Sequence, residues 1–169
     1  MLPVEMIPLV GVIADGKTVR LGDTRADVEQ TLENPSHTQW NSLYYFANEL
    51  RIDFDEEGRA EFIELLGGPD GALQPVIFGV AAFQAEPETL VELLKKKNGG
   101  EFVDTEKGYS YAFKKLSVGL YRESIPANVA EMMEEAEADG HPLNEADIEY
   151  EKRRTHWATI GVGVEGYYE

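Results

Sequence analysis

Strict alternation of apolar and polar residues marks one strand in each half of the chain. The apolar positions of the alternation are Leu50, Ile52 and Phe54 in the first half and Leu116, Val118 and Leu120 in the second. Successive side chains of a strand point to opposite faces of a sheet, so each pattern predicts a strand with one buried face. After the first of these strands, the acidic turn Asp55–Gly58 leads to an apolar strand at Ala60–Leu66, which completes a hairpin.

A helix is predicted ahead of each alternating strand. Thr24 is a candidate N-cap with Asp27 three residues later, and Asn34–Pro35 ends the helix that follows. In the second half, Glu86–Pro87 opens a helix with proline at its first position, and Asn98–Gly99 stops it. The apolar sides of these helices consist of Val28 and Leu32 in the first and Leu90, Leu93 and Leu94 in the second.

The two helix-plus-hairpin patterns predict an internal repeat. Matching positions lie 62 residues apart in the helices and 66 apart in the strands, and the four extra residues fall in the loop between helix and strands. The halves cover about residues 10–66 and 76–164 and are joined by the glycine-rich loop 67–71, with chance similarity of two amphipathic stretches as the alternative. We therefore expect a single α+β domain, residues 1–169, with an antiparallel sheet built from two similar halves.

The most apolar run near the start of the chain is Met6–Ala14. It is too short to cross a bilayer, and because Glu5 and no basic residue precedes it, it is a poor secretory signal. We interpret the run as a single first strand that ends at the turn Asp15–Gly16. The chain has no cysteine, which excludes disulfides and thiolate chemistry and suits a cytoplasmic protein.

The two halves differ most in the connection between the last two predicted strands of each half. A short turn suffices in the first half, whereas the second has an insertion of about residues 123–155. The predicted helix starts within it are Ser124 with Pro126 and Asn144 with Asp147. From residue 123 to 151 the sequence has ten carboxylates and no Lys or Arg. Without these ten, the net charge of −17 becomes −7, from 22 acidic and 15 basic residues, so the insertion concentrates the acidity.

The acidity of the insertion indicates the chemistry of a partner. An acidic surface repels nucleic acid and anionic membranes and speeds encounter with a basic protein. Binding surfaces usually arise on loops elaborated over a fixed scaffold, so we expect a non-catalytic protein that binds a basic protein, with solubility alone as the alternative explanation. The candidate partner-binding residues are Glu131, Glu134, Glu135, Asp139, Glu145 and Asp147 of the insertion and the C-terminal Tyr167 and Tyr168.

Four segments of the first half carry a resemblance to a known family: Leu21–Val28, Asn34–Pro35, Tyr44–Phe46 and Ile52–Gly58. Their order resembles the repeat of the beta-lactamase inhibitor proteins, which the small outer-membrane lipoproteins of the barrel-assembly machinery share. Small cytosolic bacterial immunity proteins that neutralise secreted toxins have similar layouts. The resemblance covers residues 19–66 and, more loosely, 80–122; Gly-Asp-Thr replaces Gly-Thr at the helix start, and a lipoprotein signal is lacking. It implies protein binding without catalysis, in particular an immunity-type inhibitor of a basic toxin or enzyme, for example a toxin nuclease domain.

Two motifs invite other interpretations. Asp53–Gly58 followed by Glu64 has the spacing of an EF-hand calcium loop, but its flanks predict strands where an EF-hand has helices. Gly161–Gly166 matches GxGxxG, but too few residues follow for the helix that phosphate binding requires. We expect the glycines instead to leave one face of a strand bare, so that Tyr167 and Tyr168, or a partner, can approach closely.

No catalytic or metal-binding constellation stands out elsewhere. His37, His141 and His156 are isolated and lack metal-ligand spacing, and no serine lies in a nucleophile elbow. We therefore expect no enzymatic activity, no cofactor and no metal. The alternative functions are a structural or regulatory interaction domain and, further from the pattern, a calcium- or small-molecule-binding domain.

Overall fold

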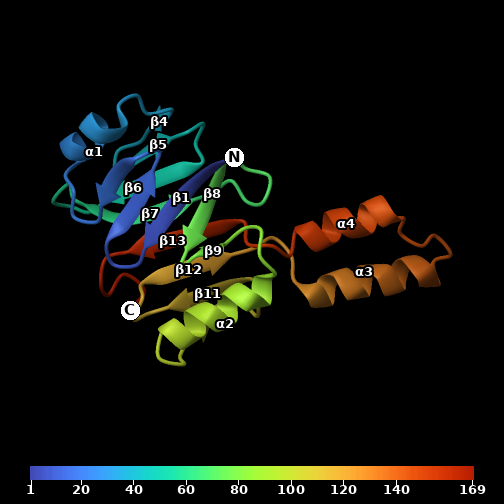
Figure 1. Ribbon diagram of the computed structural model, residues 1–169. Helices are drawn as coiled ribbons and strands as arrows, with labels where there is room; N and C mark the ends of the chain where they lie inside the picture. Colours follow the sequence, from blue (N-terminus) through green and yellow to red (C-terminus); the bar gives the residue numbers. More distant parts are fainter.

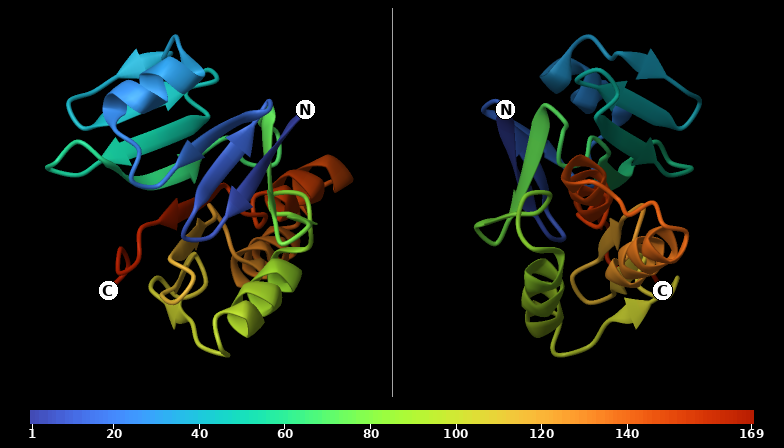
Figure 2. Two further views of the ribbon diagram at one scale, coloured as in Figure 1. Left: turned by 60° about the vertical axis from the view of Figure 1, so that its left-hand side comes forward. Right: turned by 90° about the vertical axis from the view of Figure 1, so that its right-hand side faces the viewer.

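Strands with alternating buried positions form two β-sheets in the computed structural model, which describes residues 1–169 (Figure 1). The smaller sheet has the strand order β3-β2-β1-β8-β9 and the larger the order β10-β11-β12-β13-β7-β6-β5-β4. Both sheets contribute to one core of 28 buried apolar residues, together with helices α1 (Arg25–Leu32) and α2 (Pro87–Lys97). The right-hand view of Figure 2 shows the smaller sheet, in blue and green, beside the strands of the larger one. The structure confirms the predicted α+β class.

The smaller sheet corrects the prediction of a single strand at Met6–Ala14. Its strands are β1 (Leu2–Ile7), β2 (Gly11–Ala14), β3 (Lys17–Arg20), β8 (Leu73–Ile77) and β9 (Val80–Ala81). The apolar run is two strands because the chain reverses between them, where Leu9 has a φ of 65° and the Val10 N–H donates to the Ile7 carbonyl. The turn at Asp15–Gly16 is confirmed, with both residues at positive φ between β2 and β3.

The larger sheet is antiparallel throughout and consists of two sets of four strands. The first set is β4 (His37–Thr38), β5 (Ser42–Tyr45), β6 (Leu50–Phe54) and β7 (Ala60–Leu65), and the second is β10 (Val103–Asp104), β11 (Ser110–Phe113), β12 (Val118–Tyr121) and β13 (Thr159–Gly163). Helix α1 precedes the first set and α2 the second, and the two sets meet where β13 pairs with β7.

The strand spacing of 66 residues between the halves is wrong by two. The turn after β5 joins Tyr45 to its partner Leu50, and the turn after β11 joins Phe113 to its partner Val118. Leu50 therefore corresponds to Val118, 68 residues on, whereas Leu116 lies in the turn before β12. A shift of two residues keeps every side chain on the same face of the sheet, so the alternation alone cannot detect it.

The helix starts follow the sequence signals at three of four positions. Thr24 caps α1 in a reciprocal capping box with Asp27, and Asn144 caps α4 (Glu145–Arg153) by accepting from the Asp147 N–H. Helix α2 begins with Pro87 at its first position, as predicted. Ser124 is not the cap of α3 (Pro126–Ala138), because the N-cap is Ile125 and Ser124 is buried one residue earlier.

Helices α3 and α4 form a hairpin that projects from the body of the molecule (Figure 1). They lie between β12 and β13, where the first half has only the turn between β6 and β7. Of all residues in the two helices, only Val129 is buried, and none belongs to the main core. We call residues 123–155 the acidic hairpin.

Candidate protein-interaction site

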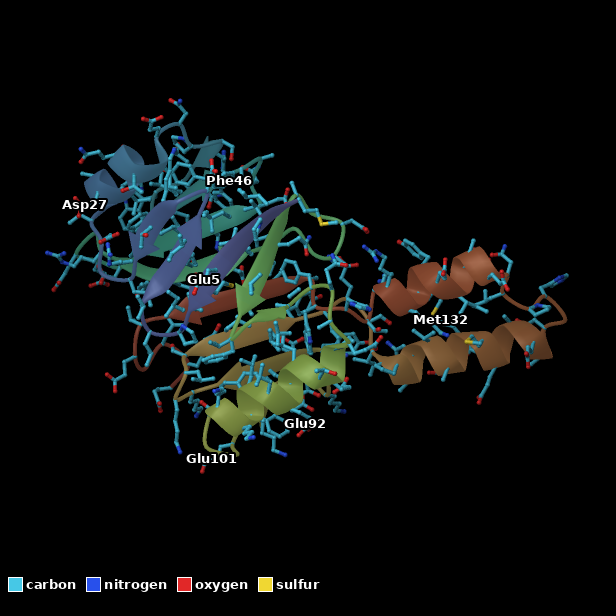
Figure 3. All side chains as sticks on the ribbon, in the orientation of Figure 1. Glu5, Asp27, Phe46, Glu92, Glu101 and Met132 are labelled. Carbon is cyan, nitrogen blue, oxygen red and sulfur yellow. The ribbon has the colours of Figure 1, made fainter.

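Most carboxylates of the acidic hairpin have no cation of the protein beside them. Arg154 forms ion pairs with Glu151 at 3.1 Å and Glu123 at 3.5 Å. The other eight carboxylates are exposed and form no ion pair: Glu131, Glu134, Glu135, Glu137, Asp139, Glu145, Asp147 and Glu149. Figure 3 shows the side chains of α3 and α4 standing out into solvent around both helices. The hairpin therefore presents an uncompensated negative surface.

The helical spacing gathers three of the four acids of α3 on one side. Glu131, Glu134 and Glu135 are separated by three and four residues, and such side chains are neighbours on a helix surface. Helix α3 has no acidic residue in its first turn and no basic residue in its last. Since the C-terminal end of a helix is the negative end of its dipole, Glu135 and Asp139 stand where negative charge is unfavourable. This placement does not stabilise the helix.

A buried arginine anchors the base of the acidic hairpin. Arg122 follows β12, and only 3% of its side chain is exposed. Its guanidinium lies 4.5 Å from the centroid of the Trp157 ring and donates to the carbonyls of Gly108, at 2.9 Å, and Thr155, at 3.2 Å. It also pairs with Glu88 of α2 at 3.1 Å. Arg122 thus joins α2, the loop before β11 and the end of the hairpin.

Further hydrogen bonds fix the two chain segments that enter and leave the hairpin. The Ser124 N–H donates to the Arg154 carbonyl, the Trp157 indole donates to the Pro87 carbonyl, and His156 Nδ1 lies 3.0 Å from the Phe83 carbonyl. Arg153 at the end of α4 pairs with Asp70 of the glycine-rich loop. The base is therefore held to the second half of the protein and, through Asp70, to the loop that joins the halves.

Two large apolar side chains stand exposed among the carboxylates. Met132 on α3, labelled in Figure 3, is 38% exposed, and Tyr150 on α4 is 64% exposed. Aromatic and methionine side chains are enriched in protein interfaces, where acidic residues are depleted from the core. Sequence reasoning did not select either residue, although a tyrosine within a run of charged residues is a signal that was available.

The predicted partner-binding tyrosines lie elsewhere, on the outer face of the larger sheet. Gly119, Gly161 and Gly163 leave that face bare, and a Cβ atom at Gly161 would collide with the Phe62 ring. Tyr167 covers this bare face by stacking on Phe62, with ring centroids 4.6 Å apart and planes 6° from parallel. Tyr168 packs against Gly119 and meets Phe62 edge to face.

The structure does not bring these tyrosines together with the acidic hairpin. The hairpin ends before the first residue of β13, whereas Tyr167 and Tyr168 follow the last, so they leave opposite ends of that strand. Burial raises the pKa of Tyr168, and the nearby Glu64 adds to this shift. Of the two expected ways to cover the glycines, by Tyr167 and Tyr168 or by a partner, the structure has the first. The eight predicted residues therefore belong to two separate surfaces.

The loop with EF-hand spacing is a β-hairpin in the structure. Asp55 uses its carboxylate to accept from the N–H groups of Glu57 and Arg59 within the turn. Asp53 and Glu64 lie on neighbouring strands and both pair with Arg51, each at 3.2 Å. Burial raises the pKa of Glu64, whereas Arg51 acts in the opposite direction. No group of three or more His, Cys, Asp or Glu side chains is placed to hold a metal ion.

Two further findings bear on the class of protein. None of the four helices is long and apolar enough to cross a membrane. Comparisons with protein-family models, with curated protein sequences and with solved structures found no match to this chain.

Proposed function

We propose that this protein is a non-catalytic binding protein whose acidic hairpin contacts a basic protein. The observation that carries the proposal is the set of eight exposed carboxylates that no Lys or Arg of the chain neutralises, placed on a projection with an anchored base. If these acids served the fold, we would expect cations beside them or a position at helix N-termini. Those of α3 have neither.

The carboxylates act mainly on the rate of association. Charge of one sign attracts an oppositely charged partner over distance and raises association rates by about 10- to 1,000-fold at low salt. Lasting affinity comes instead from desolvated aromatic and apolar anchors. Tyr150 and Met132 are the residues of the hairpin with the area to supply it.

The most specific form of the proposal is an immunity-type inhibitor of a basic toxin or enzyme. It rests on the resemblance of residues 19–66 to the beta-lactamase inhibitor type of repeat and to small immunity proteins. The arrangement of one helix ahead of each set of four antiparallel strands is compatible with that resemblance. A cytoplasmic location follows from the same proposal.

The experiment that tests the proposal compares capture by two variants of equal charge. Glu131, Glu134 and Glu135 are changed together to Lys in one variant, and the exposed Glu33, Glu106 and Glu165 are changed to Lys in its control. Immobilised wild-type protein and both variants are exposed to an extract of the native host at about 50 mM and about 500 mM salt, between which the Debye length falls from roughly 14 to 4 Å.

We expect a basic protein that the wild type and the control retain and that the hairpin variant loses. With that partner purified, the hairpin variant should associate at least about tenfold more slowly at low salt and with a flatter salt dependence. Equal capture by the hairpin variant and the control, or an unchanged association rate, refutes the proposal.

A further inference from the structure

The turn between β4 and β5 exposes a tryptophan almost completely. Trp40 is 94% exposed, whereas the other tryptophan of the chain, Trp157, is fully buried. Burying an aromatic side chain of this size contributes about 150–250 Å² of area to a core or an interface. Trp is also among the residue types most enriched in the small set of contacts that dominate binding energy. The exposed indole of Trp40 is therefore a candidate contact residue for a partner.

The turn that carries Trp40 is well ordered by hydrogen bonds. Arg25 of α1 donates from its guanidinium to the carbonyls of Trp40, at 3.1 Å, and Gln39, at 3.3 Å. The Gln39 N–H donates to the Ser42 carbonyl, and the Phe54 N–H donates to the Asn41 carbonyl. These bonds tie the turn to both α1 and β6. Trp40 is consequently displayed from a fixed backbone.

A groove lies beside Trp40, between its turn and the turn that joins β6 to β7. Its volume is about 510 Å³, and its lining includes Trp40, Phe54, Asp55, Glu56 and Glu61. Glu56 and Glu61 form no ion pair, and Arg25, the one cation of the lining, is already paired with Glu29 at 3.2 Å. Burial raises the pKa of Glu61, and the adjacent Asp55 and Asp53 raise it further. The groove combines an open aromatic surface with negative charge that the protein leaves unopposed.

We infer that this groove binds an arginine side chain on the surface of a protein partner. A guanidinium stacks on an indole face and can bind a carboxylate through two parallel hydrogen bonds, so the indole and the acids match the two properties of arginine. Lysine offers a more strongly hydrated point charge and fits the acids but not the planar surface. The inference shares with the proposed function only the basic character of the partner, because β4 and β5 lie away from the acidic hairpin (Figure 1).

The test uses the full-length protein labelled with ¹⁵N and a capped arginine, N-acetylarginine amide, as the probe. Each tryptophan gives its own indole N–H signal, and the Trp157 indole, which is buried and bonded to the Pro87 carbonyl, serves as an internal reference. We expect the Trp40 signal and the backbone amides of Asn41, Glu56 and Gly58 to shift and saturate at millimolar probe, while the Trp157 signal stays in place. The matched probe N-acetylcitrulline amide, which has the same shape without the charge, should shift them much less.

Variants then distinguish binding of the probe in the groove from nonspecific attraction of a cation to an acidic protein. Changing Glu56→Gln together with Glu61→Gln should weaken binding of the arginine probe by roughly tenfold, since it removes the charge-assisted hydrogen bonds. The control Glu33→Gln with Glu106→Gln has the same net charge and should bind the probe as the wild type does. Trp40→Leu should weaken binding as well, read from the Asn41 and Gly58 amides.

The test of the Trp40 groove can fail or succeed independently of the test of the acidic hairpin. The variant Glu131→Lys, Glu134→Lys, Glu135→Lys should retain the Trp40 shift. Equal shifts with citrulline, retention of binding in the Glu56→Gln and Glu61→Gln variant, or shifts confined to α3 and α4 would each overturn the inference.

Discussion

Arg122 is the residue whose loss should most clearly separate anchoring of the acidic hairpin from its charge. Its guanidinium is buried, donates to two carbonyls and stacks on Trp157 at 4.5 Å. Hydrogen bonds of a charged donor contribute about 1.5–3 kcal/mol each, and a desolvated cation–π contact about 2 kcal/mol. Burial of the cation itself costs several kcal/mol, which offsets part of this sum. We therefore expect Arg122→Ala to lower the free energy of unfolding by about 3 kcal/mol.

A second substitution at the same position separates the contribution of stacking on Trp157 from that of the hydrogen bonds to the two carbonyls. Arg122→Met retains the apolar stem over Trp157 but leaves the carbonyls of Gly108 and Thr155 without their donor, and it should cost about 2 kcal/mol. The Glu88→Gln control should cost less than about 1 kcal/mol, because Glu88 is 61% exposed and its pairing is screened by solvent. Urea unfolding followed by Trp fluorescence and far-UV circular dichroism measures all three.

If Arg122 anchors the acidic hairpin, its loss should also change where amide hydrogen exchange accelerates. In Arg122→Ala, amide hydrogen exchange should accelerate first in α3 and α4, since their base loses its connection to α2 and to the loop before β11. A loss of stability below about 0.5 kcal/mol, or exchange that accelerates equally throughout the protein, would refute the reasoning.

Three other changes have outcomes that follow from backbone geometry and burial. Ala47 has a φ of 53°, so Ala47→Gly should raise the free energy of unfolding by about 0.5–1 kcal/mol, measured by urea unfolding, whereas the control Ala130→Gly on the exposed side of α3 should lower it by about 1 kcal/mol. Gly161→Ala should destabilise by about 2 kcal/mol and reduce the near-UV dichroism of the tyrosines, because its methyl group displaces Phe62; unchanged spectra would count against the packing described. The raised pKa of Tyr168 means that the folded state holds its proton above pH 10, where the unfolded state releases it, so stability is lost as pH rises. Between pH 9 and 11 the wild type should lose about 1.4 kcal/mol more than Tyr168→Phe in urea unfolding, and equal losses would contradict the burial of that hydroxyl.

Local signals in the sequence were sufficient for most elements of the fold. The capping box of Thr24, the proline of α2 and the turn at Asp15–Gly16 each depend on neighbouring residues alone, and the structure has all three. The prediction of one strand at Met6–Ala14 is wrong because the reversal lies between two apolar segments and no polar residue interrupts them, although Pro8 and Gly11 are residue types that mark turns. The spacing error between the halves arose because alternation has a period of two and is blind to a shift of two.

The candidate site was predictable in composition but not in arrangement. The exposed acids of the hairpin follow from a run of carboxylates without cations, which sequence displays directly. That Tyr167 and Tyr168 lie at the other end of β13 depends on strand pairing, which no local pattern encodes. The site at Trp40 is not predictable for the same reason, since only the fold shows that its turn faces solvent beside the acids of the β6–β7 hairpin.

The absence of residues 123–155 from the main core has an evolutionary consequence. Substitutions on the two projecting helices leave nearly intact the packing that lets the molecule fold. If the acidic hairpin is the binding surface, as we propose, its specificity can therefore change at little risk to folding, whereas changes in the strands or at Arg122 beneath it carry that risk.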